Sequence, residues 1–375
     1  MINPQNIYDL LVKNSIELFT GVPDSLLKDF CAYITDNAPS NRHIIAANEG
    51  SAVAIAAGHY LATKNPALVY MQNSGIGNAT NPLLSLADEK VYKIPMLLMV
   101  GWRGEPNVKD EPQHIKQGEV TLDLLAAMKI PYEIIDTDET VAVKQIQQLT
   151  IGTKTKGFPH AAVIRKNTFS PYTLKSKREN AFEMSREDAM QVVVNSLQKE
   201  DIIVSTTGKL SRELFEYREH TGAGHKNDFL TVGSMGHSIS IALGIAPNTE
   251  KNIYCLDGDG AILMHTGAMA TAGVSGLKKL RHIVFNNGAH ESVGAQPTVA
   301  LQVNLPQIAT AFGYKNVWSV STLEELLKVL NVFGSGSTDG PSFLEIKINT
   351  LSRENLGRPT RTTHENKDDF MQNFK

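Results

Sequence analysis

Two short polar motifs carry the residues best suited to chemistry in this chain. Gly258-Asp259-Gly260 ends one apolar stretch, and Asn286-Asn287-Gly288 follows another. If the two stretches are neighbouring parallel strands, their carboxyl ends meet at one edge of the sheet, where the side chains of Asp259 and Asn287 converge. Carboxylate and amide oxygens suit a hard cation, and the glycines let a phosphate approach the backbone. The pair therefore predicts a metal and diphosphate site.

The surroundings of these motifs favour that interpretation over a chance turn. Gly-Asp-Gly alone is common in turns. Here, residues 261–285 provide room for a crossover helix and a return strand before the two asparagines. Two other phosphate motifs do not fit: Ile203 stands where a P-loop ending at Gly208-Lys209 needs glycine, and Leu263 breaks the dinucleotide fingerprint.

Composition predicts a globular protein without nucleic-acid or membrane partners. Hydrophobic residues make up 42% and charged residues 20%, and the formal net charge is −3. No apolar stretch approaches the roughly 20 residues of a membrane helix, and residues 1–6 do not resemble the start of a signal peptide. Cys31 and Cys255 lack metal-ligand spacing and are expected to be reduced core residues. We therefore predict a cytoplasmic enzyme.

The chain repeats one order of elements on either side of a polar segment. A small-residue helix, an apolar strand, a Gly-rich turn, a helix and a second strand occur in each half. This pattern predicts an α/β fold of two homologous domains, each a mostly parallel sheet flanked by helices, at residues 1–170 and 185–375. Residues 171–184 are the expected linker, and Ser185 with Asp188 forms a helix-capping signature.

The two motifs resemble the signature of thiamin-diphosphate (ThDP) enzymes. The resemblance implies a pyrimidine-binding first domain, a diphosphate-binding second domain and no central third domain. It also implies that Asp259, Asn287 and the carbonyl of Ala289 hold Mg²⁺ on the cofactor's diphosphate. The further cofactor-binding residues that it implies are Thr207, Gly208, Ser234, Met235, Gly258, Gly260 and Ala261, with Met235 as the apolar wedge beneath the bent cofactor.

Glu49 follows the apolar stretch Ile44–Ala47 and begins a small-residue helix. Its position matches the ThDP-enzyme glutamate that binds the pyrimidine ring and activates the cofactor. The alternative is an acidic residue that stabilises a helix N-terminus by at most about 1 kcal/mol. With the downstream metal motif in the same chain, Glu49 is the main catalytic candidate and is counted among the cofactor-binding residues.

Four segments together resemble the phosphonopyruvate decarboxylases and, closely, the sulfopyruvate decarboxylases: residues 21–25, 101–118, 290–298 and 357–360. The resemblance implies decarboxylation of 3-phosphonopyruvate to 2-phosphonoacetaldehyde and CO₂, a step in phosphonate biosynthesis such as that of 2-aminoethylphosphonate. A doubly anionic substrate needs cations and fixed donors. The substrate candidates are Asp24, Ser25, Arg103, Lys116 and Arg358, although a mixed-charge loop is also typical of a solvated surface.

The group that protonates the product carbon is not assigned by the sequence. Larger decarboxylases of this kind carry a carboxylate six residues beyond the metal-binding asparagine, where this chain has Val293. His114 and His290 are the catalytic candidates, and Glu291 and Asp24 are alternatives. A buried histidine is also typical of a hydrogen-bonded packing residue.

Four hypotheses about activity and assembly accompany these residues. The resemblance implies a homodimer or larger homo-oligomer in which Glu49 of one subunit meets the metal motif of another. The alternatives to phosphonopyruvate decarboxylation are sulfopyruvate decarboxylation and carboligation of two keto acids. A non-catalytic ThDP-binding regulatory subunit is the alternative from another class. The presence of both Glu49 and Asp259 argues against this last possibility.

Overall fold

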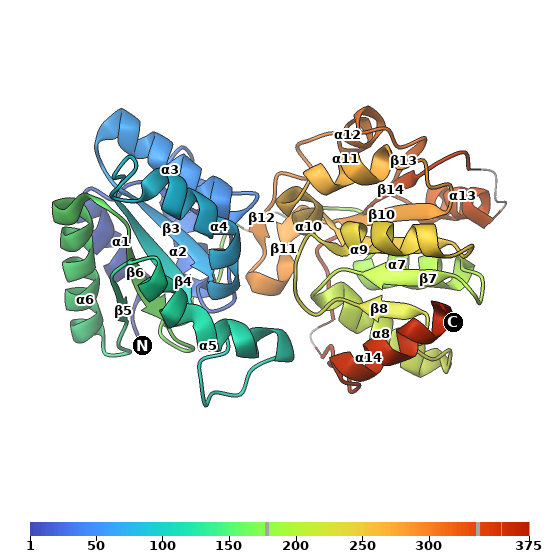
Figure 1. The fold of residues 1–375 in the computed structure, drawn as a ribbon, viewed down its shortest axis with the longest axis horizontal. Helices are drawn as coiled ribbons and strands as arrows, with labels where there is room; N and C mark the ends of the chain where they lie inside the picture. The colour runs from blue at the N-terminus through green and yellow to red at the C-terminus, as the bar shows by residue number, and fades with distance from the viewer. Residues whose placement is uncertain (177–179, 335–337, 354, 375) are drawn as a thin grey trace. The chain divides into compact units, whose positions relative to one another are not determined.

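The computed structural model describes residues 1–176, 180–334, 338–353 and 355–374. The chain divides into two compact units, one of Met1–Lys177 with His290–Pro297 and the other of Arg178–Ala289 with Thr298–Lys375. Each unit contains a six-stranded sheet with helices on both faces (Figure 1). The predicted α/β fold of two similar domains is therefore confirmed, and the described residues form no third domain.

The first unit has the strand order β2-β1-β3-β4-β6-β5, and every neighbouring pair is parallel. Its strands are β1 Phe19–Gly21, β2 His43–Ile45, β3 Ala67–Gln72, β4 Met96–Gly101, β5 Tyr132–Ile134 and β6 His160–Ile164. Its helices are α1 Pro4–Lys13, α2 Lys28–Asn37, α3 Glu49–Thr63, α4 Ile76–Pro82, α5 Pro112–Ala127 and α6 Glu139–Gly152.

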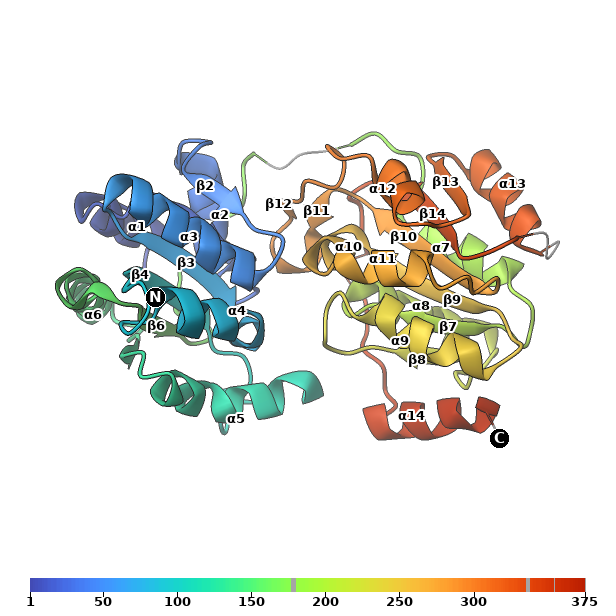
Figure 2. The ribbon, with the colours of Figure 1, turned by 45° about the horizontal axis from the view of Figure 1, so that its top comes forward.

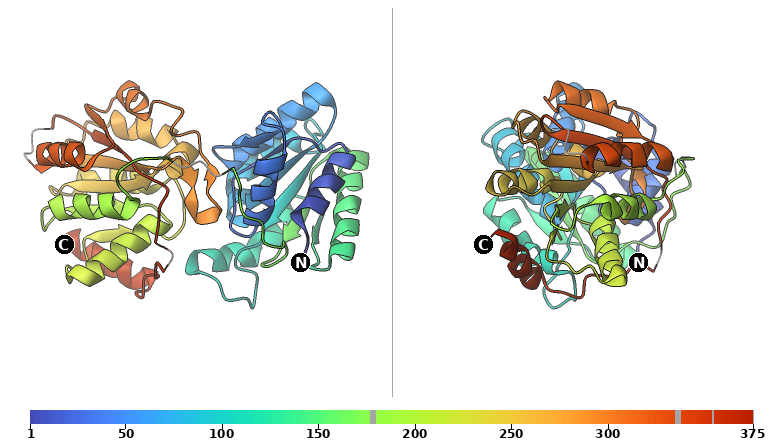
Figure 3. Two further views of the ribbon diagram at one scale, coloured as in Figure 1. Left: turned by 180° about the vertical axis from the view of Figure 1, so that it is seen from behind. Right: turned by 90° about the vertical axis from the view of Figure 1, so that its right-hand side faces the viewer.

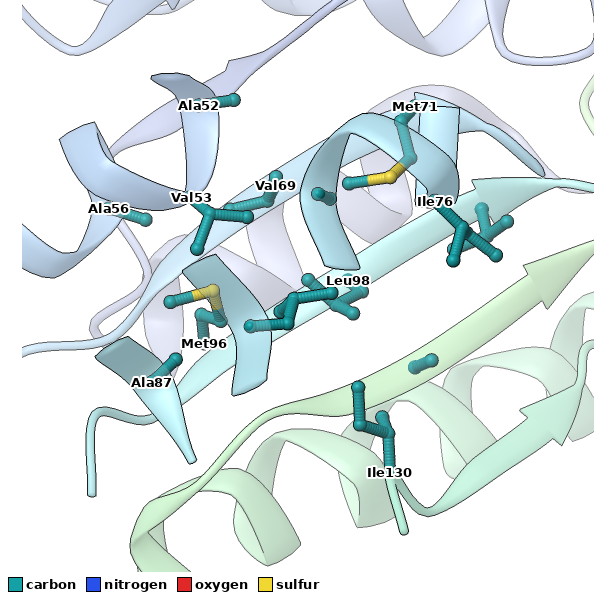
Figure 4. Packing of buried hydrophobic residues seen from close by; sticks show 14 of the residues in the cluster. Ala52, Val53, Ala56, Val69, Met71, Ile76, Ala87, Met96, Leu98 and Ile130 are labelled. Atoms are coloured by element: carbon teal, nitrogen blue, oxygen red, sulfur yellow. The ribbon is translucent and has the colours of Figure 1, made fainter. Parts of the chain in front are cut away.

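Alternating residues of β3 and β4 build the two cores of this unit. Val69, Met71 and Leu98 face α3 and α4, where Ala52 and Ala56 let α3 approach the sheet closely (Figure 4). The intervening strand residues face α1, α2 and α6, and α1 and α6 lie side by side (Figure 3, left). A parallel sheet buried on both faces needs such continuous apolar strands.

The second unit has the order β13-β14-β10-β9-β7-β8, again with parallel neighbours. Its strands are β7 Ile202–Ser205, β8 Asp228–Leu230, β9 Ile253–Gly258, β10 Leu280–Asn286, β13 Asn316–Val320 and β14 Ser342–Lys347. Its helices are α7 Arg186–Ser196, α8 Lys209–Thr221, α9 Ser238–Ile245, α10 Asp259–Met264, α11 Gly267–Gly273, α12 Leu305–Ala311, α13 Leu323–Gly334 and α14 Thr363–Met371. The short strands β11 Ala289–His290 and β12 Gln296–Pro297 form a separate sheet. Within the described ranges, no helix is long and apolar enough to cross a membrane.

The two large sheets have the same topology. In the first, β1 lies between β2 and β3, so the chain changes direction across the sheet after its second strand. In the second, β7 lies between β8 and β9 in the same way. Ligands of open parallel sheets bind beyond the carboxyl ends of the strands at such a switch point. Each unit therefore has one candidate ligand-binding edge, at the carboxyl ends of its strands.

Local capping explains two of the helix starts. Ser185 and Asp188 form a capping box at the start of α7, which confirms the signature found in the sequence. Asn48 caps α3 by accepting a hydrogen bond from the Ser51 N–H at 2.8 Å. The helix consequently begins at Glu49 and carries this side chain at the carboxyl end of β2.

The C-terminal helix α14 lies at the edge of the second sheet, beyond β8 (Figure 2). Asn366 on this helix accepts a hydrogen bond from the Leu230 N–H at 3.2 Å through its side-chain oxygen. Its side-chain nitrogen donates to the Asp228 carbonyl at 2.8 Å. One side chain therefore pairs with the backbone of the edge strand as a neighbouring strand would.

Candidate active site

Asp259 and Asn287 stand at the same edge of the second sheet. Strands β9 and β10 are neighbours, and Gly258 is level with Phe285 in their register. Asp259 begins α10 directly after β9, and Asn287 follows the last residue of β10. Their exposed fractions are only 4% and 6%. The topology therefore brings together the two side chains that the sequence predicted as a metal site.

The carboxylate of Asp259 is buried but well supplied with hydrogen-bond donors. Burial raises its pKa to about 7, and hydrogen bonds from Thr298 and from backbone N–H groups oppose this rise. The Thr298 hydroxyl donates to Oδ2 of Asp259 at 2.5 Å. Since a nearby cation favours the ionised form, this environment suits a carboxylate that a metal ion keeps charged.

The two asparagines play different structural parts. Asn286 donates to the buried Glu345 carboxylate at 2.7 Å and accepts from the Gly288 N–H at 3.1 Å, so it holds the turn in the sheet. Asn287 accepts from the Ala289 N–H at 3.0 Å through its side-chain oxygen. An amide oxygen is a suitable ligand for a hard cation. The predicted ligand, Asn287, lies just beyond the end of β10, whereas Asn286 is the last residue of the strand and is fully buried.

The end of β7 provides further polar groups at this edge. Gly208 is the N-cap of α8 with φ +104°, a left-handed conformation that favours glycine, and no side chain of the described residues caps the helix. Thr207 donates to the Val232 carbonyl at 2.8 Å. The buried hydroxyl of Thr206 has no hydrogen-bond partner among the described residues. An anionic group beside the α8 N-terminus would satisfy this hydroxyl and the uncapped N–H groups.

Met235 lies in a turn after β8 that packs tightly against α10. The turn closes with a hydrogen bond from the His237 N–H to the Ser234 carbonyl at 3.2 Å, and Ser234 has φ +52°. Gly236 has φ +84°, and a Cβ there would lie 2.8 Å from the Ala261 carbonyl oxygen. The turn is therefore packed directly against the helix that carries Asp259, with Met235 half-buried.

Glu49 is buried at the carboxyl edge of the first sheet, with 5% of its surface exposed. Asn78 donates to its Oε2 at 2.8 Å, and burial raises the pKa of its carboxyl. A Cβ on Gly75 would lie 2.4 Å from Oε1, so the glutamate side chain rests directly on that glycine. Asn78 and Gly75 were not predicted as site residues, although they lie in α4 and in the Gly-rich turn that follows β3 at the same edge.

We expect Gly75→Ala to displace the Glu49 carboxyl and to reduce turnover by about 10- to 100-fold, because small misplacements of catalytic groups cost about this much. Gly75 has φ −70°, which alanine adopts readily, and the group in its way is a side chain that can move. Steady-state kinetics and thermal melting should therefore show lost kcat with nearly unchanged stability. Gly77→Ala is the matched control, since a Cβ there meets nothing within 4 Å. Equal kcat in both variants would contradict the prediction.

Asp24 lies fully buried at the same edge of the first sheet. Gln72 donates to its Oδ1 at 2.7 Å, and the Leu26 N–H donates to its Oδ2 at 2.9 Å. Burial raises the pKa of this carboxyl, against the effect of the Gln72 hydrogen bond. Gly101 at the end of β4 permits the contact, because a Cβ there would lie 2.2 Å from Oδ2.

Arg103 and Ser25 adjoin Asp24, and the guanidinium is already engaged. Its Nε donates to Asp110 at 2.8 Å, a second nitrogen reaches the other Asp110 oxygen, and Nη1 donates to Ser25 at 2.7 Å. Three of the five N–H groups of an arginine are thus used, and Asp110 balances the charge. His114 is near this group, and its pKa is lowered to about 4 by burial and then by Arg103. His114 is consequently neutral near pH 7.

The other predicted candidates are Lys116, Arg358 and His290. The side chain of Lys116 is 81% exposed and donates to Glu119 at 2.5 Å on the surface of α5. Arg358 is exposed and belongs to the second unit. His290 is half-buried at the start of the 290–297 segment, which groups with the first unit. Asp110 and Gln72 are the polar partners that the sequence analysis did not select.

The structure also brings Cys255 close to Asp257 and His282. Potential ligand atoms of the three residues lie within 4.8 Å of one another, and all three side chains are buried. Asp257 accepts from the Gly258 N–H at 2.9 Å, and His282 lies 3.1 Å from the Tyr314 hydroxyl. These contacts describe a polar network inside the sheet, distinct from the Asp259 edge.

Comparison with known families agrees with this geometry. Residues 4–127 match the model described as the N-terminal TPP binding domain of thiamine pyrophosphate enzymes, and residues 206–346 match the C-terminal TPP binding domain. The chain therefore belongs to the thiamine pyrophosphate enzymes, whose cofactor is ThDP. Within this class it is a carboxy-lyase, similar over nearly its whole length to phosphonopyruvate decarboxylases.

Three relatives define that similarity. Phosphonopyruvate decarboxylase of Streptomyces viridochromogenes is 32% identical over 97% of this chain and 93% of its own length. The enzyme of the same name from Streptomyces hygroscopicus is 31% identical over 97% of this chain and 92% of its own length. Sulfopyruvate decarboxylase of Methanosarcina acetivorans is 27% identical over 89% of this chain and 88% of its own length.

Proposed function

We propose that the chain decarboxylates 3-phosphonopyruvate to 2-phosphonoacetaldehyde and CO₂, as a step in phosphonate biosynthesis. The observation that carries this substrate is the 32% identity to a phosphonopyruvate decarboxylase along almost the full length of both chains. The chemistry has independent support. Glu49 and Asp259 each lie buried at the carboxyl edge of a sheet, where a parallel α/β fold binds its ligands.

ThDP, when bound, supplies the carbanion that attacks the keto group and accepts the electrons left by the loss of CO₂. Asp259, Asn287 and the carbonyl of Ala289 would hold Mg²⁺, which would neutralise the charge of the diphosphate. Thr206 and the N-terminus of α8 would provide hydrogen-bond donors to the phosphate oxygens, and Thr207 holds the turn through its bond to Val232. The Glu49 carboxyl would share a proton with a nitrogen of the pyrimidine ring. Burial raises the pKa of this carboxyl, which favours such sharing.

The cluster at the end of β1 and β4 forms the substrate site in this proposal. Ser25 and the two remaining N–H groups of Arg103 are donors for one anionic end of the substrate. His114, which is neutral near pH 7, donates a hydrogen bond without adding charge. Asp24, with its raised pKa, is the acid best suited by its environment to deliver a proton to the product carbon.

Assembly and location follow from the same proposal. Glu49 and Asp259 belong to different units, and two copies of the chain would complete each site between the first unit of one and the second unit of the other. We therefore propose that the protein forms a homodimer or a larger homo-oligomer. The cytoplasm is the proposed compartment, where the buried free thiols of Cys31 and Cys255 stay reduced.

The test is a direct comparison of two substrates on the purified protein with ThDP and Mg²⁺. We expect aldehyde and CO₂ release from 3-phosphonopyruvate with a kcat/KM at least about tenfold above that for sulfopyruvate, because a dianionic phosphonate gains about 1.4 kcal/mol or more from an added charged hydrogen bond. Faster sulfoacetaldehyde formation would select the sulfopyruvate alternative, which the engaged charge of Arg103 favours. Product condensed from two keto acids would instead indicate a carboligase.

A further inference from the structure

Thr298 connects the two halves of the predicted metal site. Its hydroxyl donates to Oδ2 of Asp259 at 2.5 Å, and its backbone N–H donates to the carbonyl of Gly288 at 2.9 Å. Thr298 is buried, with 6% of its surface exposed, and its hydroxyl also accepts from the Ala300 N–H at 3.3 Å. A single residue therefore holds the carboxylate after β9 and the turn after β10.

We infer that Thr298 is a positioning residue for the metal site, which sets the rotamer of Asp259 and its distance from the Asn287–Ala289 turn. This inference rests on the proposed role of Asp259 as a ligand of Mg²⁺. The bond from Thr298 to Oδ2 fixes the orientation of the carboxylate and hence the direction of the lone pairs that it offers to a cation. The Gly288 contact keeps the turn from moving away when the carboxylate is bound.

Two physical features make this contact more than packing. The hydrogen bond joins a hydroxyl to a buried carboxylate, and such charge-assisted bonds are short and about twice as strong as neutral ones. Mg²⁺ also demands nearly ideal octahedral geometry, so a small rotation of one carboxylate is costly. Partners that orient metal ligands in this way typically change metal affinity by about 10- to 100-fold when removed.

The experiment measures ThDP binding by tryptophan fluorescence while Mg²⁺ is titrated, in the full chain without substrate. We expect Thr298→Val to need about 10- to 100-fold more Mg²⁺ for half-maximal binding, and Thr298→Ser, which keeps the hydroxyl, to need about the wild-type concentration. Thr310→Val is the matched control, because the Thr310 hydroxyl donates to the Pro306 carbonyl of its own helix. Thr298→Ala, which also lacks a hydroxyl, provides the same test if valine is not accommodated.

The outcomes separate this inference from the proposed function. If wild-type ThDP binding depends on Mg²⁺, and Thr298→Val and Thr298→Ala need the wild-type Mg²⁺ concentration, the role of Thr298 is overturned. The proposed metal site is not affected by that result. An equal increase in the Mg²⁺ concentration needed by Thr298→Ser and Thr298→Val would overturn the role of Thr298 as well, because the hydroxyl would then be irrelevant. Wild-type ThDP binding that is independent of any divalent cation would instead reject the proposed metal site.

Discussion

Replacing Glu49 with glutamine is expected to lower the decarboxylation kcat by about 10²- to 10⁴-fold, the usual contribution of a positioned acid–base group. The amide has the same shape, so the hydrogen bond from Asn78 and the contact with Gly75 can persist. It cannot share a proton with a ring nitrogen as a carboxyl does. Activation of the cofactor should therefore fail, although the side chain still occupies its place.

The measurement combines steady-state kinetics with ThDP binding and thermal melting. Binding and melting temperature should stay close to those of the wild type. Glu139→Gln is the matched control, since Glu139 also begins a helix of the first unit and accepts hydrogen bonds from Asn3 and Asn6. Near-normal turnover by the Glu49 variant would show that this carboxylate only stabilises the helix N-terminus. It would contradict the proposed role of Glu49 in activating the cofactor.

Asp259→Ala is expected to raise the concentrations of Mg²⁺ and ThDP needed for half-maximal binding by about 100-fold or more, because even indirect partners of a metal contribute about 10- to 100-fold. The substitution removes a charged ligand rather than a supporting contact. The metal-free fold should be little affected, because burial already raises the pKa of this carboxyl to about 7 and disfavours its charge.

Thermal melting gives this prediction a second readout. At a ThDP concentration 100 times the wild-type Kd, the wild type should gain about 2.7 kcal/mol of stability, whereas a variant with 100-fold weaker binding should gain only about 0.4 kcal/mol. Asp201→Asn is the control, because Asp201 is another buried carboxylate with a raised pKa, placed before β7 at the opposite edge of the sheet. Unchanged cofactor stabilisation in Asp259→Ala would be incompatible with the proposed metal site.

Features that depend on local pattern were predictable from the sequence. The apolar stretches before Gly258 and Asn286 became adjacent parallel strands, as continuous apolar runs in an α/β protein should. Ser185 and Asp188 capped α7 through contacts within one helical turn. The repeated order of elements led to the same strand order in both sheets. Adjacent parallel strands then placed Asp259 beside Asn287.

Contacts between side chains distant in the chain were not predictable in this way. Asn78 reaches Glu49 from another helix, and Thr298 reaches Asp259 across 39 positions of sequence. Their residue types are ordinary, and only the packed fold gives them direction. The pairing of Arg103 with Asp110 spans only seven positions, but it depends on how the loop between them folds. From the sequence alone, Arg103 was expected to be free to bind substrate. In the folded loop, Asp110 provides its counter-charge.

The contact between Asn366 and β8 limits how copies of this protein can associate. An edge strand with unpaired backbone groups is a template on which another chain can add a strand, by specific assembly or by aggregation. At β8, the Leu230 N–H and the Asp228 carbonyl are already paired with one side chain of α14. A sheet continuous between subunits therefore cannot form there while α14 is in place. Self-association through this region must use side-chain surfaces instead of the backbone.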